Sequence, residues 1–158
     1  MSRLDSILDS IVDSLGVASI TLPSGVVVTK PAGLTVNRQR AIPIDTTALP
    51  EFGVYLLGES VDTGPTRERS RLARRKAQVV VQLRIDAGSA TPDQALDPYR
   101  RWAVLAVCLD PRRNNLTHDI TEIGTEWDQE TRSSRLAIAS TVFLVDYVTS
   151  AFDIDAAT

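Results

Sequence analysis

Few residues in this sequence could perform acid–base or nucleophilic chemistry. His118 is the only histidine, and it lies in a polar connection beside Asp119. A Ser–His–Asp triad can assemble from distant positions, so the sequence leaves it open, but the Gly-x-Ser-x-Gly turn of many serine hydrolases is absent. Cys108, the only cysteine, lies in an apolar stretch, where burial raises the pKa of a thiol. We therefore expect a solvated loop histidine, an inert cysteine and no enzyme.

Four carboxylates could in principle supply a glycosidase pair or a site for a hard metal ion: Glu122, Glu126, Asp128 and Glu130. Glu122 and Glu126 lie an even number of residues apart, so a strand would place both on one face, with Gly124 between them. Exposed acidic side chains on an outer sheet face explain the same pattern, and we favour this explanation. No glycine-rich phosphate-binding motif is present. The sequence predicts no metal and no cofactor.

The densest cluster of charge is basic. The ten residues from 67 to 76 hold six of the seventeen basic side chains: Arg67, Arg69, Arg71, Arg74, Arg75 and Lys76. Such a run could contact nucleic-acid phosphates with salt-sensitive affinity, or pair with an acidic surface of a neighbouring subunit, which suits the bidentate arginine side chain. No aromatic residue between Tyr55 and Tyr99 is present to stack on bases. We favour a subunit interface.

Length and composition limit the class of protein. A chain of 158 residues that is 43% apolar suits one domain with a proper core. A net charge of −3 and a pI near 5.1 argue against a globally basic nucleic-acid binder. One cysteine allows no disulfide within the chain. Neither a membrane span nor a signal peptide is recognisable, so we expect synthesis in a reducing compartment and no membrane partner.

Apolar periodicity predicts the elements in the first half of the chain. A stripe from Leu4 to Leu15 predicts a helix with Gly16 at its C-terminal cap. We expect this helix to dock on a sheet, although packing on a neighbouring subunit would use the same stripe. Residues 17–22 and 25–29 are expected to pair as strands across a turn. The apolar residues of Phe52–Leu57 predict a short strand that ends at Gly58.

Two further elements follow the basic run. Val79–Asp86 alternates apolar and polar residues, which is typical of a strand with one wet face. Asp97-Pro98 resembles an N-cap followed by proline at the first helical position. We therefore predict a helix from Asp97 to about Leu109 whose second half is deeply buried.

The C-terminal third predicts a hairpin of Ile120–Trp127, a polar turn at Asp128–Ser134, and Leu136–Val148. The last segment is rich in β-branched and aromatic residues, which favours a strand. Its apolar residues occupy odd and even positions, so both faces are expected to be covered. Asp146, the one charge within it, should lie at a sheet edge or meet a basic partner.

Together these elements predict a single α+β domain over residues 1–158, in which a mainly antiparallel sheet packs against two helices. Three segments fall outside the predicted elements: an irregular segment at 30–50, a basic loop at 60–77 and a short C-terminal tail at 150–158. Long ordered loops are often functional.

The order of these elements resembles that of the tail-terminator proteins of tailed bacteriophages, also called minor tail or tail-completion proteins. Family members begin with an amphipathic helix, followed by a strand similar to Phe52-Gly-Val-Tyr-Leu-Leu-Gly-Glu59 and a basic or polar stretch. A strand like Ala77–Asp86 and a helix like Asp97–Leu109 come next.

The last two strands complete the resemblance. Ile123-Gly124-Thr125-Glu126 is similar to a Gly-Thr-Glu sequence of the family, and Tyr147-Val148-Thr149 to its terminal Tyr-x-Thr. The resemblance spans Leu4 to Thr149, and its specificity lies in the order and spacing of short motifs. Residues 17–50 match no motif of the family.

The resemblance implies a structural protein of the virion tail or neck, assembled in the host cytoplasm. Family members form rings, usually hexamers, that cap the finished tail tube and offer a surface for head attachment. The implied partners are other copies of the chain, the tail tube protein and a head–tail connector or neck protein. Genomic DNA passing through the ring is a further candidate partner, and in a ring the basic partner of Asp146 could belong to the next subunit. Identical subunits joined head to tail close into a ring when the rotation closes.

Three alternatives stay open from the sequence. Another neck or head–tail connector protein, such as a stopper or completion protein, would share most of these features. A nucleic-acid-binding module would use the basic stretch Arg67–Lys76. An enzyme that depends on His118 is the last alternative.

Overall fold

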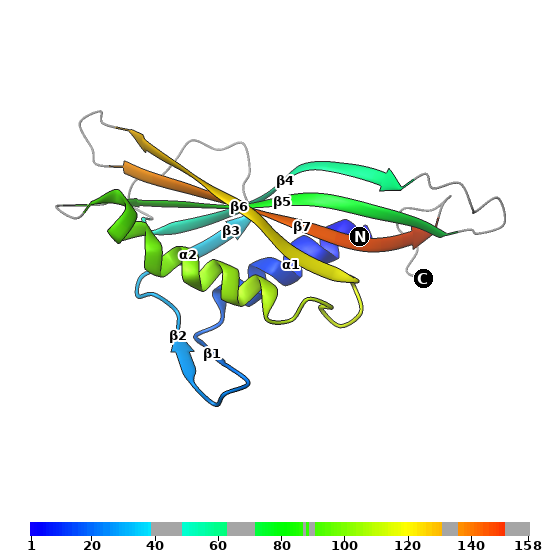
Figure 1. Cartoon of the computed structure of the whole chain (residues 1–158), viewed down its shortest axis with the longest axis horizontal. Coiled ribbons are helices and arrows are strands. Elements are labelled where there is room, and N and C mark those ends of the chain that lie inside the picture. The colour runs from blue at the N-terminus through cyan, green and yellow to red at the C-terminus, as the bar shows by residue number, and fades with distance from the viewer. Residues whose placement is uncertain (39–48, 63–71, 87, 89–90, 131–135, 151–158) are drawn as a thin grey trace.

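A five-stranded sheet carries two helices on one of its faces (Figure 1). The computed structural model describes residues 1–38, 49–62, 72–86, 88, 91–130 and 136–150. The sheet has the order β3-β4-β5-β7-β6, and only the β3–β4 pair is parallel. The predicted α+β domain, with a mostly antiparallel sheet and two helices, is confirmed.

The helices are α1 (Arg3–Gly16) and α2 (Pro92–Cys108). The sheet strands are β3 (Thr35–Arg38), β4 (Glu51–Asp62), β5 (Leu72–Asp86), β6 (Asp119–Glu130) and β7 (Leu136–Ser150). A separate antiparallel hairpin consists of β1 (Ser19–Thr21) and β2 (Val27–Thr29), and it projects from the helix layer away from the sheet (Figure 1). This hairpin confirms the predicted pairing, and Gly25 in its turn has a φ of +85°.

Helix α1 follows the predicted apolar stripe. The hydroxyl of Ser2 accepts a hydrogen bond from the backbone N–H of Asp5, which caps the helix. The stripe is buried through Ile7, Leu8, Ile11 and Leu15. Gly16 is the last helical residue, since Val17 is already extended.

Helix α2 begins five residues before the predicted start at Asp97, because Thr91 and Pro92 supply the N-cap and first-turn proline. The second proline, Pro98, lies inside the helix. It has no N–H to donate to the carbonyl of Gln94, so one helical hydrogen bond is missing. The predicted deep burial of the second half is confirmed for Trp102, Ala103, Ala106 and Val107, whereas Val104, Leu105 and Cys108 are only half-buried. The indole N–H of Trp102 donates to the Leu15 carbonyl at 3.0 Å.

The segments expected to be irregular contain more strand than predicted. Thr35–Arg38, inside the irregular segment 30–50, forms β3 parallel to the start of β4, and residues 39–48 lie outside the described part. Strand β4 continues through a bulge at Leu57 instead of ending at Gly58. Residues 60–62 and 72–77, expected in the basic loop, therefore belong to the ends of β4 and β5, and residues 60–62 pair with residues 74–76.

Strand β7 is paired along its length with β5 and buries one face under the helices. The odd-numbered positions from Ala137 to Thr149 are buried, whereas most even-numbered positions from Ile138 to Val148 are only half-buried. No described helix covers that second face, so the prediction that both faces are covered is wrong for the described residues. Apolar residues on the even positions gain partial burial from neighbouring strands instead.

A buried arginine joins the two helices. The guanidinium of Arg113 donates to the carbonyl and hydroxyl of Ser10 and to the hydroxyl of Ser14 on α1. It also donates to the carbonyls of Ala106 and Val107 in the last turn of α2. Burial lowers the pKa of this guanidinium. The loop after α2 is therefore fixed against both helices.

Replacing Arg113 with methionine keeps the apolar stem but leaves buried carbonyls and hydroxyls without donors. We expect Arg113→Met to lower the free energy of unfolding by about 2–4 kcal/mol. Urea unfolding measures this as a lower midpoint at unchanged slope. The neighbouring Arg112 is exposed, so Arg112→Met should stay within about 0.5 kcal/mol of the wild type. Equal midpoints for the two variants would contradict the role of Arg113.

Candidate functional site

The described half of the basic run is divided between the two faces of β5. Arg67, Arg69 and Arg71 lie outside the described residues. Arg74 and Lys76 are exposed on the sheet face without helices, whereas Arg75 points to the helix-bearing face. Because strand side chains alternate, three consecutive basic residues cannot form one continuous patch.

Arg74 forms an ion pair within the chain. Its Nε donates to both carboxylate oxygens of Asp146 at 3.0 Å, and its Nη2 donates to Oδ2. This hydrogen bonding holds the pKa of Asp146 below its usual value, and the charges of His118 and Lys76 add to the effect. The predicted basic partner of Asp146 is confirmed, although it belongs to the same chain. The sheet-edge alternative is wrong, because β7 lies between β5 and β6.

Arg75 belongs to a second polar network on the opposite face. Its Nε donates to the hydroxyl of Thr149 at 2.8 Å, and its Nη1 lies 3.5 Å from Oε1 of Glu59. The hydroxyl of Tyr147 donates to the same oxygen of Glu59. Burial, followed by the bond to Glu59, raises the pKa of Tyr147. This Glu59 network connects the ends of three strands and brings together the sequence segments that carried the family resemblance.

Glu122 and Glu126 of β6 do not form a pair, and the side chains of the other two candidates, Asp128 and Glu130, lie outside the described residues. A bulge at Ile123 separates Glu122 from Gly124, so Glu122 lies opposite Phe143 and Glu126 lies opposite Ser140 on the other face. The prediction of a shared face is therefore wrong, because a bulge reverses the alternation. Glu122 instead accepts a hydrogen bond from Nη2 of Arg100 at 3.2 Å. Among the residues placed by the structure, no group of three or more His, Cys, Asp or Glu side chains could hold a metal ion.

The two candidate nucleophile–base residues, Cys108 and His118, have different surroundings. Cys108 is half-buried at the end of α2, and burial raises the pKa of its thiol, with a further contribution from Glu122. His118 is exposed, and its backbone N–H donates to the Asp146 carbonyl at 2.7 Å. The side chain of His118 lines a pocket together with Arg3 and Arg112.

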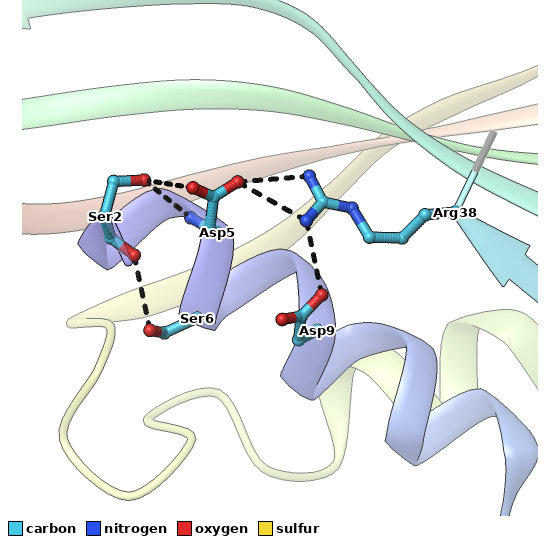
Figure 2. Close-up of polar contacts among 5 residues, drawn as sticks. All are labelled: Ser2, Asp5, Ser6, Asp9 and Arg38. Atoms are coloured by element: carbon cyan, nitrogen blue, oxygen red, sulfur yellow. Dashed lines mark hydrogen bonds and ion pairs between the residues drawn. The ribbon is translucent and has the colours of Figure 1, made fainter. Parts of the chain in front are cut away.

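An ion-pair cluster that the sequence did not predict joins α1 to the end of β3. Figure 2 shows the guanidinium of Arg38 between the carboxylates of Asp5 and Asp9, at 3.3 Å from each. The hydroxyl of Ser2 and then Arg38 lower the pKa of Asp5. The four-residue spacing of the aspartates puts both on one helix face. All three side chains are about 40–50% exposed, so water screens these pairs.

Both outer edges of the sheet are open among the described strands. Strand β3 pairs with β4 only as far as Val54, which leaves the outer edge of β4 from Tyr55 onward without a described partner. Strand β6 pairs only with β7.

Large apolar side chains are exposed along these two edges. Leu57 is 58% and Val61 45% exposed on β4, and Ile123 is 55% and Trp127 47% exposed on β6. An open edge with exposed apolar residues can pair with another chain. No helix in the described part of the chain is long and apolar enough to cross a membrane.

Neutralising neighbouring basic residues in β5 should change the free energy of unfolding by different amounts. Arg75→Met removes the donor to Glu59 and Thr149, so we expect the free energy of unfolding to fall by about 2 kcal/mol. Lys76→Met, one position away on the exposed face, should change it by less than about 0.5 kcal/mol. Urea unfolding of both variants measures the difference. A larger loss from Lys76→Met would contradict the Glu59 network.

The ion pair of Asp146 should make stability depend on pH. Its lowered pKa means that the folded chain favours the carboxylate, so this stabilisation is present above the usual value of 3.8 and is lost as the pH falls through the lower folded value. At pH 7, Asp146→Asn should cost about 1 kcal/mol, a modest figure because the half-exposed Arg74 is screened. Urea midpoints at several pH values should show the same deficit at pH 5 and 7 and a shrinking one below 3.8. A deficit that already shrinks between pH 7 and 5 would refute the lowered pKa.

Comparison with models of known protein families and with curated protein sequences gave no match for this chain.

Proposed function

We propose that this protein is a ring-forming tail terminator of a tailed bacteriophage, located in the tail or neck of the virion. The proposal combines the order of the sequence motifs with one structural observation. That observation is the pair of sheet edges, on opposite sides of a single sheet, that carry exposed apolar residues and that no described strand covers.

The two open edges differ from each other, and this difference favours a ring. The outer edge of β4 on one subunit could lie beside β6 of the next, so that the sheet continues from subunit to subunit. Such a contact is heterologous, because different surfaces of identical chains meet, and it closes into a ring when the rotation closes. An edge that paired with its own copy would give a dimer.

The motifs that resemble the family support the same proposal. Glu59 ends the first strand motif, and Tyr147 and Thr149 belong to the last. The Glu59 network fixes the far ends of β4, β5 and β7 relative to one another. A rigid sheet end suits a protein that acts by binding to the tube and blocking its growth.

The basic stretch supports a DNA-binding module less well. Arg74 already has a carboxylate partner, and Arg75 lies on the opposite face inside the Glu59 network. The residues that would neutralise consecutive phosphates are therefore divided between two faces. We also propose no catalytic step, because the Cys108 thiol is half-buried with a raised pKa and no hydrogen bond joins it to His118 among the described residues.

Mass photometry across protein concentrations, with and without the cognate tail-tube protein, tests the ring. We expect a closed oligomer, with a hexamer as the family resemblance implies, that associates with tube ends. Leu57→Lys and Trp127→Lys should each abolish it, because each places a charge on one of the two edges. Leu109→Lys is the control, since Leu109 is 41% exposed at the end of α2.

Mixing the two edge variants separates head-to-tail contacts from symmetric ones. Each Leu57→Lys chain keeps an intact β6 edge and each Trp127→Lys chain an intact β4 edge, so the mixture should give heterodimers and no rings. A chain that stays monomeric and never associates with tube ends would disprove the proposal.

A further inference from the structure

A pocket of about 510 Å³ lies where the loop after α2 meets the end of β7. Among the described residues, its charged lining consists of two arginines, Arg3 from the first turn of α1 and Arg112 from the loop, and the imidazole of His118 lies in the same lining. Leu72 at the start of β5 and Val148 near the end of β7 add apolar side chains. This lining suits a ligand that combines negative charge with an apolar group.

The basic side chains retain hydrogen-bond donors. Arg3 uses Nε and Nη2 for the carbonyls of Leu116 and Asn115, at 3.0 and 2.6 Å, which leaves three of its five N–H donors. The side chain of Arg112 makes no hydrogen bond or ion pair with any described residue. The ring nitrogens of His118 likewise have no hydrogen-bond partner among the residues that the structure describes.

The acidic group that faces His118 does not neutralise the pocket. Asp146 lies close enough for the charge of His118 to lower its pKa, but Arg74 is the main cause of that shift. Arg74 donates hydrogen bonds to both oxygens of this carboxylate, so Asp146 already has a cationic partner. The guanidinium groups of Arg3 and Arg112 therefore present positive charge to any other anion, and the imidazole of His118 adds a hydrogen-bonding group beside them.

We propose that this pocket binds segment 151–158 of a second copy of the chain, an interaction that rests on the self-association proposed above. The segment lies outside the described residues, and its sequence Ala-Phe-Asp-Ile-Asp-Ala-Ala-Thr alternates large apolar side chains with carboxylates. Asp153 and Asp155 match the basic side chains in charge, and Phe152 and Ile154 match the apolar ones.

The described chain ends beside the pocket, because strand β7 ends at Ser150, which pairs with the pocket residue Leu72. The self-association proposed above makes the segment of a neighbouring copy the occupant that we argue for. Binding to the pocket of the same chain is the alternative, and replacing the two aspartates would then leave ring formation unchanged.

A phosphodiester ligand fits the pocket less well. None of the described residues that line it is a Phe, Tyr or Trp that could stack on a base. The chain as a whole carries a net charge of −3, which repels an extended polyanion.

Peptide binding tests the pocket directly. The receptor is the full chain with Asp153→Asn and Asp155→Asn, whose own segment no longer carries the two charges. We expect a fluorescent peptide with the wild-type sequence of 151–158 to bind saturably in fluorescence anisotropy at low salt. Adding Arg112→Gln and His118→Gln to the receptor should weaken binding about 10-fold or more, because charge-assisted hydrogen bonds are lost. A peptide with both aspartates changed to asparagine should lose affinity similarly.

The matched control is Arg101→Gln in the same receptor, because Arg101 is an exposed arginine on α2 that pairs with Asp97. It should leave peptide binding unchanged. Equal affinity of all receptors, or stronger binding of a single-stranded oligonucleotide than of the peptide, would overturn the inference.

Mass photometry then separates this inference from the ring itself. Chains with Asp153→Asn and Asp155→Asn should form fewer rings than the wild type. Rings that form equally well from these chains would refute the docked segment and leave the proposed function standing. A wild-type chain that is monomeric at every concentration would refute both.

Discussion

The contact between the two helices depends on the buried guanidinium of Arg113. The last carbonyls of a helix have no intrahelical donor, and Arg113 supplies donors to two of them, on Ala106 and Val107. Its positive charge also opposes the negative end of the α2 dipole. The remaining bonds reach Ser10 and Ser14 on α1, so one side chain satisfies groups on both helices. The charge is thus buried among carbonyls and hydroxyls.

The loop that carries Arg113 also determines where other elements begin. Arg113, Asn114 and Asn115 have positive φ angles of 43°, 54° and 66°, a conformation that asparagine tolerates better than most residues. The chain reverses here, and the His118 N–H reaches the Asp146 carbonyl just before β6 starts beside β7. Arg3 binds two carbonyls of the same loop. One loop therefore contacts both ends of α1, sets the start of β6 and forms a wall of the pocket.

The sequence predicted what depends on local periodicity. The α1 stripe and the cores of β5, β6 and β7 follow from alternation or helical spacing, and these elements were found where expected. Both Thr91-Pro92 and Asp97-Pro98 resemble an N-cap followed by proline, and the sequence predicted the start of α2 at the second pair. The helix begins at the first pair instead, and Leu96, which lies between the two pairs, is fully buried. The bulges at Leu57 and Ile123 were missed because a bulge depends on the partner strand. Arg38 was missed for the same kind of reason, since its partners lie on α1, far away in sequence.

The two bulges restrict how the open edges can pair. An unbroken edge accepts an added strand in many registers, which promotes aggregation, and a bulge interrupts the ladder and twists the strand. Leu57 on β4 and Ile123 on β6 are the extra residues of the two bulges and are more than half exposed. A bulge bends its strand and increases the local twist, so a neighbouring strand fits the outer edge in fewer registers than it would fit a regular edge. Edges of this kind would disfavour indiscriminate stacking yet allow one defined contact, which is the property that a ring of fixed subunit number requires.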